Sequence, residues 1–123
     1  MSDAEGRATM TVDFAVTPQS DDGLLVVEVS GEVDLFTAPD LKSAITDGID
    51  AGSEKVVVDL SRTTFLDSTA LGVLIGAVKR LRANGGSLTI VNTDENIAKT
   101  FEITGLDQIF SIHKTRDAAV AAL

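Results

Sequence analysis

The chain has 123 residues, 44% of them hydrophobic, which is enough for one domain with a buried core. It contains no cysteine and a single histidine, which excludes disulfide bonds, thiolate chemistry and a structural zinc site. A formal net charge of −9 disfavours nucleic acid as a partner. No apolar run is long enough to span a membrane, and residues 1–9 lack the layout of a signal peptide. Together with the missing cysteines, this predicts a cytoplasmic protein with no membrane partner.

The pattern after the first residues is typical of a β-hairpin. Val12, Phe14 and Val16 alternate with polar residues, which predicts a half-buried strand. Residues 18–23 (Pro-Gln-Ser-Asp-Asp-Gly) predict a turn, because each of them favours a break in regular structure. Residues 24–30 follow as a second strand, so the two strands are expected to pair antiparallel.

A helix is predicted to follow this hairpin. Thr37 can cap its first turn, and Pro39 lacks an N–H group at a position where none is needed. Leu41, Ile45 and Ile49 then recur at four-residue spacing, which gives the helix one apolar stripe for the core.

Strands and helices alternate through the rest of the chain, which favours parallel pairing of the strands. The predicted fold is a single α/β domain at residues 9–123: a mixed, mostly parallel β-sheet opened by an antiparallel hairpin, with about four α-helices packed on it. Residues 1–8 are expected to form a flexible tail. The predicted strands are 56–60, 88–91 and 109–112, the predicted helices are 68–83, 94–104 and 115–123, and a short loop is expected between residues 60 and 67.

Acidic residues are concentrated in the first part of the chain. Residues 1–54 hold twelve acidic and two basic side chains, whereas residues 55–123 hold seven acidic and eight basic ones. The acidic surface either keeps the domain soluble or steers it toward a basic patch on a partner protein, and the composition leaves both interpretations open.

The sequence offers few groups for catalysis. His113 follows the last predicted strand and is expected to have no acid or thiol partner, which is typical of a surface histidine. Ser68 lacks the Gly-x-Ser-x-Gly setting of serine hydrolases, and Gly85-Gly86 lacks the residues that would cradle a phosphate. All five phenylalanines are expected in core positions, which leaves no aromatic platform for bases. We therefore predict a protein that is not an enzyme and uses no metal or cofactor.

The candidate functional residues lie in one segment, residues 59–76. Ser68 is predicted in the first turn of a helix, where unpaired backbone N–H groups and the helix dipole favour an anion such as a phosphoryl group. The alternative is that Asp67 or Ser68 serves only as the helix N-cap.

The helix predicted to begin at Ser68 carries two glycines on the side that faces away from the core. In helical projection Thr69, Gly72, Val73 and Gly76 lie away from the predicted core stripe. Each glycine inside a helix is about 1 kcal/mol less favourable than alanine, so an exposed pair needs a reason. One reason is the close approach of a partner's backbone, which the apolar Val73 favours. The other is contact with a neighbouring loop of the same domain.

Several motifs together resemble a known family. Asp59-Leu-Ser, Phe65-Leu-Asp-Ser-Thr and Leu71-Gly-Val-Leu occur in one stretch, and Ser30-Gly-Glu-Val-Asp34, followed by Thr37-Ala, lies upstream. They resemble the recurrent segments of bacterial anti-sigma factor antagonists, which are STAS-domain proteins. The order of predicted elements matches that family from about residue 10 to residue 123.

The resemblance implies a partner switch. Ser68 would be phosphorylated by a partner that is both a serine kinase and an anti-sigma factor. The unphosphorylated chain would bind this partner and release its sigma factor, and a PP2C-type phosphatase would reset the switch. The chain has Ala70 where the family usually has glycine; we expect the fold and phosphorylation to survive, and the effect on kinase choice stays open. The implied partner-binding residues are Asp34, Asp67, Ser68, Thr69, Gly72, Val73 and Gly76.

Two other functions are compatible with parts of the pattern. STAS domains also serve as partner subunits of transporters and lipid-trafficking complexes without a phospho-switch, but the intact Asp67-Ser68-Thr69 stretch favours the antagonist. A response-regulator-like receiver would use Asp59, at a strand end, as its phosphate acceptor. Receivers also need a metal-binding acidic pair after the first parallel strand and a lysine after the last strand, and the two cannot both be placed in this sequence.

Overall fold

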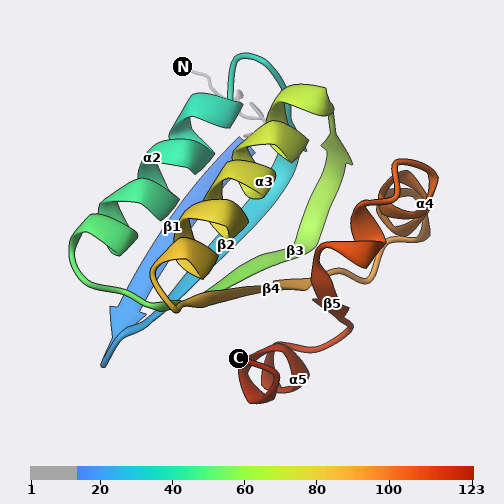
Figure 1. Cartoon of the computed structure of the whole chain (residues 1–123). Helices are drawn as coiled ribbons and strands as arrows, with labels where there is room; N and C mark the ends of the chain where they lie inside the picture. Colours follow the sequence, from blue (N-terminus) through green and yellow to red (C-terminus); the bar gives the residue numbers. More distant parts are fainter. Residues whose placement is uncertain (1–13) are drawn as a thin grey trace, which may run out of the picture.

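The fold of the chain was obtained as a computed structural model, which describes residues 14–123 (Figure 1). Val12 and the predicted tail at 1–8 lie outside the described residues. Five strands form one sheet in the order β1-β2-β3-β4-β5; β1 is antiparallel to β2, and the other neighbours are parallel. The predicted mixed sheet opened by an antiparallel hairpin is therefore confirmed.

The described residues form four α-helices and one 3-10 helix around this sheet. In chain order the elements are β1 (Phe14–Asp21), β2 (Leu24–Val33), α2 (Ala38–Asp50), β3 (Lys55–Leu66), α3 (Ser68–Ala83), β4 (Ser87–Val91), α4 (Glu95–Ile103), the 3-10 helix (Leu106–Gln108), β5 (Ser111–His113) and α5 (Arg116–Ala121).

The turn of the hairpin is much shorter than predicted. β1 continues to Asp21, so the expected turn over 18–23 was wrong, and only Asp22 and Gly23 connect the strands. Their φ angles of 51° and 84° are both positive, as a two-residue type I′ turn requires, and Asp-Gly is a preferred sequence for it. Pro18 is tolerated within β1 because this strand lies at the edge of the sheet.

β3 is longer than predicted, and this positions the candidate site. The strand runs on to Leu66, so the loop expected between residues 60 and 67 was wrong. Two register shifts against β2 let the bulged strand continue, and the buried Thr63 hydroxyl donates a hydrogen bond to the Val29 carbonyl at 2.9 Å in the same region. α3 therefore starts directly where β3 ends.

The last strand also differs from its prediction. Gly105, with φ of 76°, is followed by the 3-10 helix, so β5 pairs through 111–113 instead of 109–112. α5 is shorter than the predicted 115–123, and Thr115 caps it by accepting a hydrogen bond from the Ala118 N–H at 3.1 Å.

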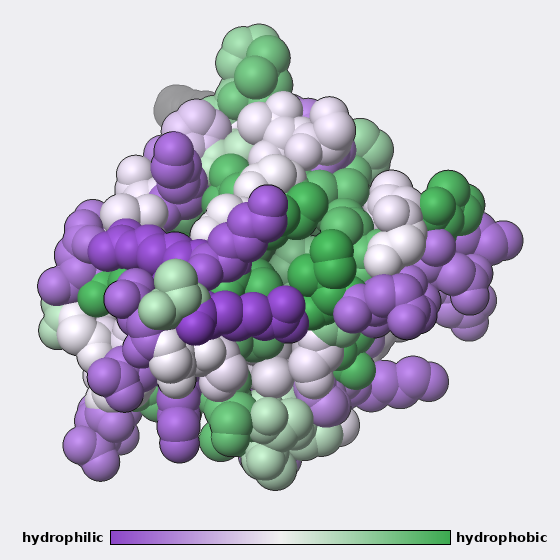
Figure 2. All heavy atoms as spheres, viewed as in Figure 1, coloured by the Kyte–Doolittle hydropathy of each residue, from purple (hydrophilic) through white to green (hydrophobic). Residues whose placement is uncertain are grey.

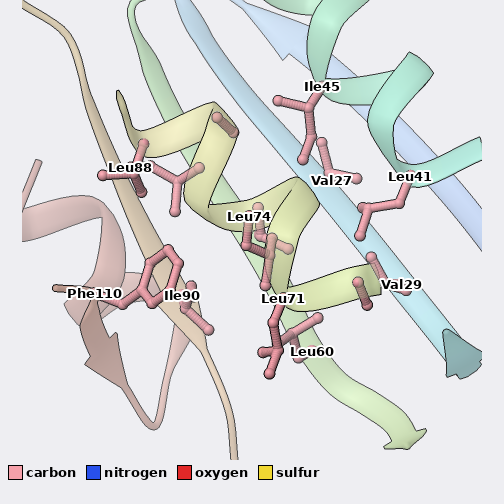
Figure 3. Packing of buried hydrophobic residues seen from close by; sticks show 14 of the residues in the cluster. Val27, Val29, Leu41, Ile45, Leu60, Leu71, Leu74, Leu88, Ile90 and Phe110 are labelled. Atoms are coloured by element: carbon pink, nitrogen blue, oxygen red, sulfur yellow. The ribbon is translucent and has the colours of Figure 1, made fainter. Parts of the chain in front are cut away.

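The hydrophobic residues form two clusters on opposite faces of the sheet, because successive strand residues point to opposite faces. α2 and α3 lie side by side over one face (Figure 1). The large cluster fills the space beneath them, with Val27 and Val29 of β2 facing Leu41 and Ile45 of α2 (Figure 3). The small cluster lies on the other face under α5 and consists of Val57, Val91 and Ala119.

Candidate functional site

The start of α3 and the loop before α2 lie next to each other at one end of the sheet. Val33 and Leu66 are register partners at the ends of β2 and β3, and the Asp67 N–H donates a hydrogen bond to the Val33 carbonyl at 3.1 Å. The structure therefore brings Asp34 together with Ser68, although the two are distant in the sequence.

Asp67 is the N-cap of α3. Its carboxylate accepts a hydrogen bond from the Ala70 N–H at 3.0 Å, so the cap does not require the Ser68 hydroxyl. Ser68 is the first residue of the helix and is exposed, and Thr69 is half-buried. The methyl group of Ala70 is fully buried, so it is not available for direct contact with a partner.

Asp34 fixes the conformation of the loop before α2. Its carboxylate accepts hydrogen bonds from the N–H groups of Phe36 at 2.9 Å and Thr37 at 3.1 Å. The Thr37 hydroxyl accepts one from the Asp34 N–H at 2.8 Å. Thr37 is the N-cap residue, as predicted, but its side chain closes this loop instead of capping the helix. Desolvation alone would raise the pKa of Asp34, but these hydrogen bonds outweigh it and hold the pKa below its usual value.

An apolar groove of about 490 Å³ runs between α2 and α3. A Cβ atom built at Gly72 or Gly76 meets nothing within 4 Å, so the described residues give no support to contact with a loop of the same domain. Val73 is half-buried and packs against the large cluster while it also lines the groove. The lining residues are Thr69, Gly72, Val73, Gly76, Ala77 and Arg80 of α3 and Lys42, Ile45, Thr46 and Ile49 of α2.

Three exposed apolar side chains beside this site were missed in the sequence. Leu35 and Phe36 in the loop before α2 are 62% and 85% exposed, and Phe65 near the end of β3 is 48% exposed. The expectation that all five phenylalanines occupy core positions was therefore wrong for Phe36 and Phe65. Figure 2, viewed as Figure 1, shows a hydrophobic projection at the top of the molecule, where the loop between β2 and α2 lies.

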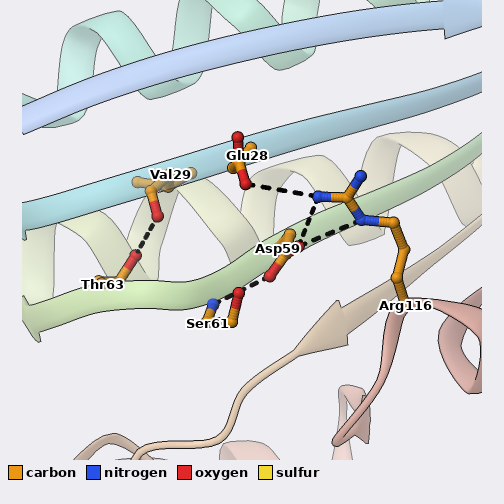
Figure 4. Close-up of polar contacts among 6 residues, drawn as sticks. All are labelled: Glu28, Val29, Asp59, Ser61, Thr63 and Arg116. Carbon is orange, nitrogen blue, oxygen red and sulfur yellow. Dashed lines mark hydrogen bonds and ion pairs between the residues drawn. The ribbon is translucent and has the colours of Figure 1, made fainter.

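Asp59, the alternative phosphate acceptor, is buried and paired with Arg116 of α5. Its side chain is 6% exposed and accepts hydrogen bonds from Arg116 at 2.7 Å and from the Ser61 N–H at 2.9 Å (Figure 4). Arg116 also lies 3.6 Å from the Glu28 carboxylate. Desolvation opposes ionisation of Asp59, but the contacts with Ser61 and Arg116 prevail and lower its pKa. This arrangement ties α5 to the sheet.

His113 and the acidic side chains are the candidate metal ligands among residues 14–123. His113 is half-buried and its Nε2 lies 2.7 Å from the Ser111 hydroxyl. Across residues 14–123, histidine and acidic side chains nowhere gather in groups of three or more that could hold a metal ion. The helices in the same part of the chain are all too short or too polar to cross a membrane.

Comparisons with known proteins identify relatives of this chain. The STAS domain family matches residues 15–119. An anti-sigma-B factor antagonist of Staphylococcus aureus is 32% identical over 105 residues, which cover 85% of this chain and 95% of that protein. One from Staphylococcus epidermidis is 33% identical over 93 residues, or 76% of this chain and 86% of that protein. The crystal structure of an anti-sigma factor antagonist from Mycobacterium paratuberculosis has a TM-score of 0.81 and 32% identity, covering 89% of this chain and 92% of that one. This chain therefore belongs to the STAS domain family, as the motifs around Asp34 and Ser68 indicated.

Proposed function

We propose that this chain is an anti-sigma factor antagonist controlled by phosphorylation of Ser68. The unphosphorylated chain binds an anti-sigma factor that is also a serine kinase, and the sigma factor is released. Phosphorylation of Ser68 by the same partner ends the complex, and a PP2C-type phosphatase restores the binding form. The names of the curated relatives support the antagonist role, since both are anti-sigma-B factor antagonists.

The observation that carries this proposal is the position of Ser68. It is exposed at the first residue of a 16-residue helix whose N-cap is already supplied by Asp67. The hydroxyl is accessible to a kinase, and the first-turn N–H groups and helix dipole can stabilise the phosphate without a change of fold. The adjacent groove, with its open Gly72 and Gly76, offers the surface on which a partner can dock beside this serine.

The chemistry of transfer explains why the product binds weakly. The Ser68 Oγ attacks the γ-phosphorus of ATP, its proton passes to a base on the kinase, and the bond to the bridging oxygen of ADP breaks. The phosphoserine, with a charge of about −1.5 to −2, then faces the terminal phosphate of ADP and also stands beside Asp67. Like-charge contacts at an interface are unfavourable by several kcal/mol, so about 3 kcal/mol would weaken the complex on the order of a hundredfold.

The test uses purified anti-sigma factors of the source organism, incubated with the chain and ATP. Mass spectrometry should find the phosphate on Ser68, with Thr69 a minor site. Ser68→Ala should bind the kinase constitutively, whereas Ser68→Asp should bind weakly and keep the wild-type circular dichroism spectrum. Dominant modification outside Asp67–Thr69, or equal affinity of the two variants, contradicts the switch. Constitutive copurification with an ATP-binding transporter subunit would instead support the transporter or lipid-trafficking role.

A further inference from the structure

Leu35 and Phe36 form an exposed apolar tip next to Ser68. They are 62% and 85% exposed, so they contribute little to the core of this domain. Leu35 lies two residues beyond Val33 and Ser68 two residues beyond Leu66, and Val33 and Leu66 are paired at the ends of their strands. The tip and the serine therefore leave the sheet at neighbouring positions.

Hydrogen bonds fix the backbone conformation of the tip. Asp34 accepts hydrogen bonds from the N–H groups of Phe36 and Thr37, and the Thr37 hydroxyl accepts one from the Asp34 N–H. The loop backbone is thus ordered before any partner arrives, which reduces the conformational entropy that binding would remove. Phenylalanine is among the residues enriched in the buried centre of protein interfaces, so an exposed one on an ordered loop suits a binding contact.

The surroundings of the tip indicate what surface it fits. Glu32 and Asp40 are exposed on either side of it in the sequence. An apolar tip flanked by acidic residues is complementary to a hydrophobic pocket with lysine or arginine side chains at its edge.

We infer that Leu35 and Phe36 are an apolar anchor that inserts into a basic-rimmed hydrophobic pocket on the kinase that phosphorylates Ser68. This inference rests on the proposed function. Because the anchor and Ser68 project from paired strand ends, docking of the anchor sets the position of the serine hydroxyl relative to the nucleotide. Recognition of the exposed serine then depends on a contact that lies outside α3.

The first experiment measures the affinity of Phe36→Ala for a purified kinase that phosphorylates the wild-type chain. We expect the Kd to rise at least about 30-fold, which corresponds to about 2 kcal/mol, with no change in thermal midpoint. The control is Ile103→Ala, because Ile103 is 76% exposed at the end of α4, which lies well apart from the β2–α2 loop in Figure 1. A Phe36→Ala Kd within about twofold of the control overturns the anchor.

A second measurement separates the anchor from the proposed function. Phe36→Ala should still be phosphorylated at Ser68 when the kinase is in excess, and the fall in kcat/KM should come from KM. Absence of any phosphorylation of the wild-type chain would contradict the proposed function itself, whereas identical kinetics of wild type and Phe36→Ala would contradict only the anchor. If Phe36→Ala abolishes self-association in analytical ultracentrifugation and leaves kinase affinity unchanged, the tip is a dimer contact and the inference is wrong.

A double-mutant cycle tests the role of Asp34 as a positioning residue. Asp34→Ala should weaken kinase binding because it frees the loop that holds Phe36. The double variant Asp34→Ala/Phe36→Ala should bind about as weakly as Phe36→Ala alone, since the two residues act through one contact. Additive losses in the double variant would show that Asp34 does not act through Phe36.

Discussion

Two aspartates determine the geometry around Ser68. Asp67 binds the Ala70 N–H and Asp34 binds the N–H groups of Phe36 and Thr37, so both carboxylates are used by the backbone. Asp67 satisfies a donor that the first turn of α3 leaves unpaired, whereas Asp34 holds the loop before α2. A phosphate on Ser68 would therefore join two negative charges that cannot readily move away.

A substitution at Ala70 tests whether this residue contributes to the stability of the fold or to recognition by the kinase. Its methyl group is fully buried in the first turn of α3. Ala70→Gly removes this buried group and adds backbone freedom, so we expect the free energy of unfolding to fall by about 1 to 2 kcal/mol in urea titrations. The rate of Ser68 phosphorylation under folded conditions should stay within about threefold of wild type. A large change in that rate at unchanged stability would mean that Ala70 bears on kinase recognition.

At the level of elements, one side of α3 packs in the core and the other side lines the groove beside α2. Leu71, Leu74 and Val78 are buried, as the helical projection predicted. The side that lines the groove carries Gly72 and Gly76, which have no side chains and leave the groove open. This contrast predicts that larger side chains on the groove side of α3 weaken partner binding and leave folding unchanged.

Gly72→Leu and Gly76→Leu should weaken kinase binding, because leucine side chains would occupy the groove. Stability should hold or rise by up to about 1 kcal/mol each, since leucine is the better helix former. Calorimetric titration with the kinase and thermal unfolding measure the two effects. Lys79→Leu is the matched control, because Lys79 is exposed on α3 and does not line the groove. A large loss of thermal stability in the glycine variants would contradict docking at the groove.

The elements that were predicted well have local signals. The bounds of α3 follow from the Asp67 cap and the stop at Asn84-Gly85, where Gly85 has φ of 79°. The extension of β3 could not be predicted, because residues 61–66 lack a clean alternation and pair with β2 through bulges. The hairpin was misjudged because the polar run of residues 18–21 hid the Asp-Gly turn signal.

In the whole molecule, the sequence indicated the serine and the α3 side of the groove, but not the α2 side or the exposed Leu35 and Phe36. Ser68 and its helix are contiguous in the chain, whereas the groove depends on which helix lies beside α3. Phe36 was assigned to the core together with the other phenylalanines, and no position was predicted for Leu35. The signal that could have corrected this was the place of the pair between Asp34 and Thr37, where neither a strand nor a helix period accounts for two apolar residues.

The last prediction concerns acid stability and the contact between α5 and the sheet. The pKa of Asp59 is lowered in the folded protein, so its contribution to stability is fully present above the unfolded pKa of about 3.9 and is lost as the pH falls through the lower folded value. Asp59→Asn should therefore be less stable than wild type at pH 7, by about 1 to 2 kcal/mol, a modest value because Arg116 is 42% exposed. This difference, measured by urea unfolding, should shrink steadily below about pH 4. Arg116→Gln removes the cation while keeping a polar side chain, and it should shift the acid-induced loss of stability to higher pH. A difference between wild type and Asp59→Asn that stays constant from pH 7 to the acid limit would show that the Arg116 contact does not stabilise the folded state through charge.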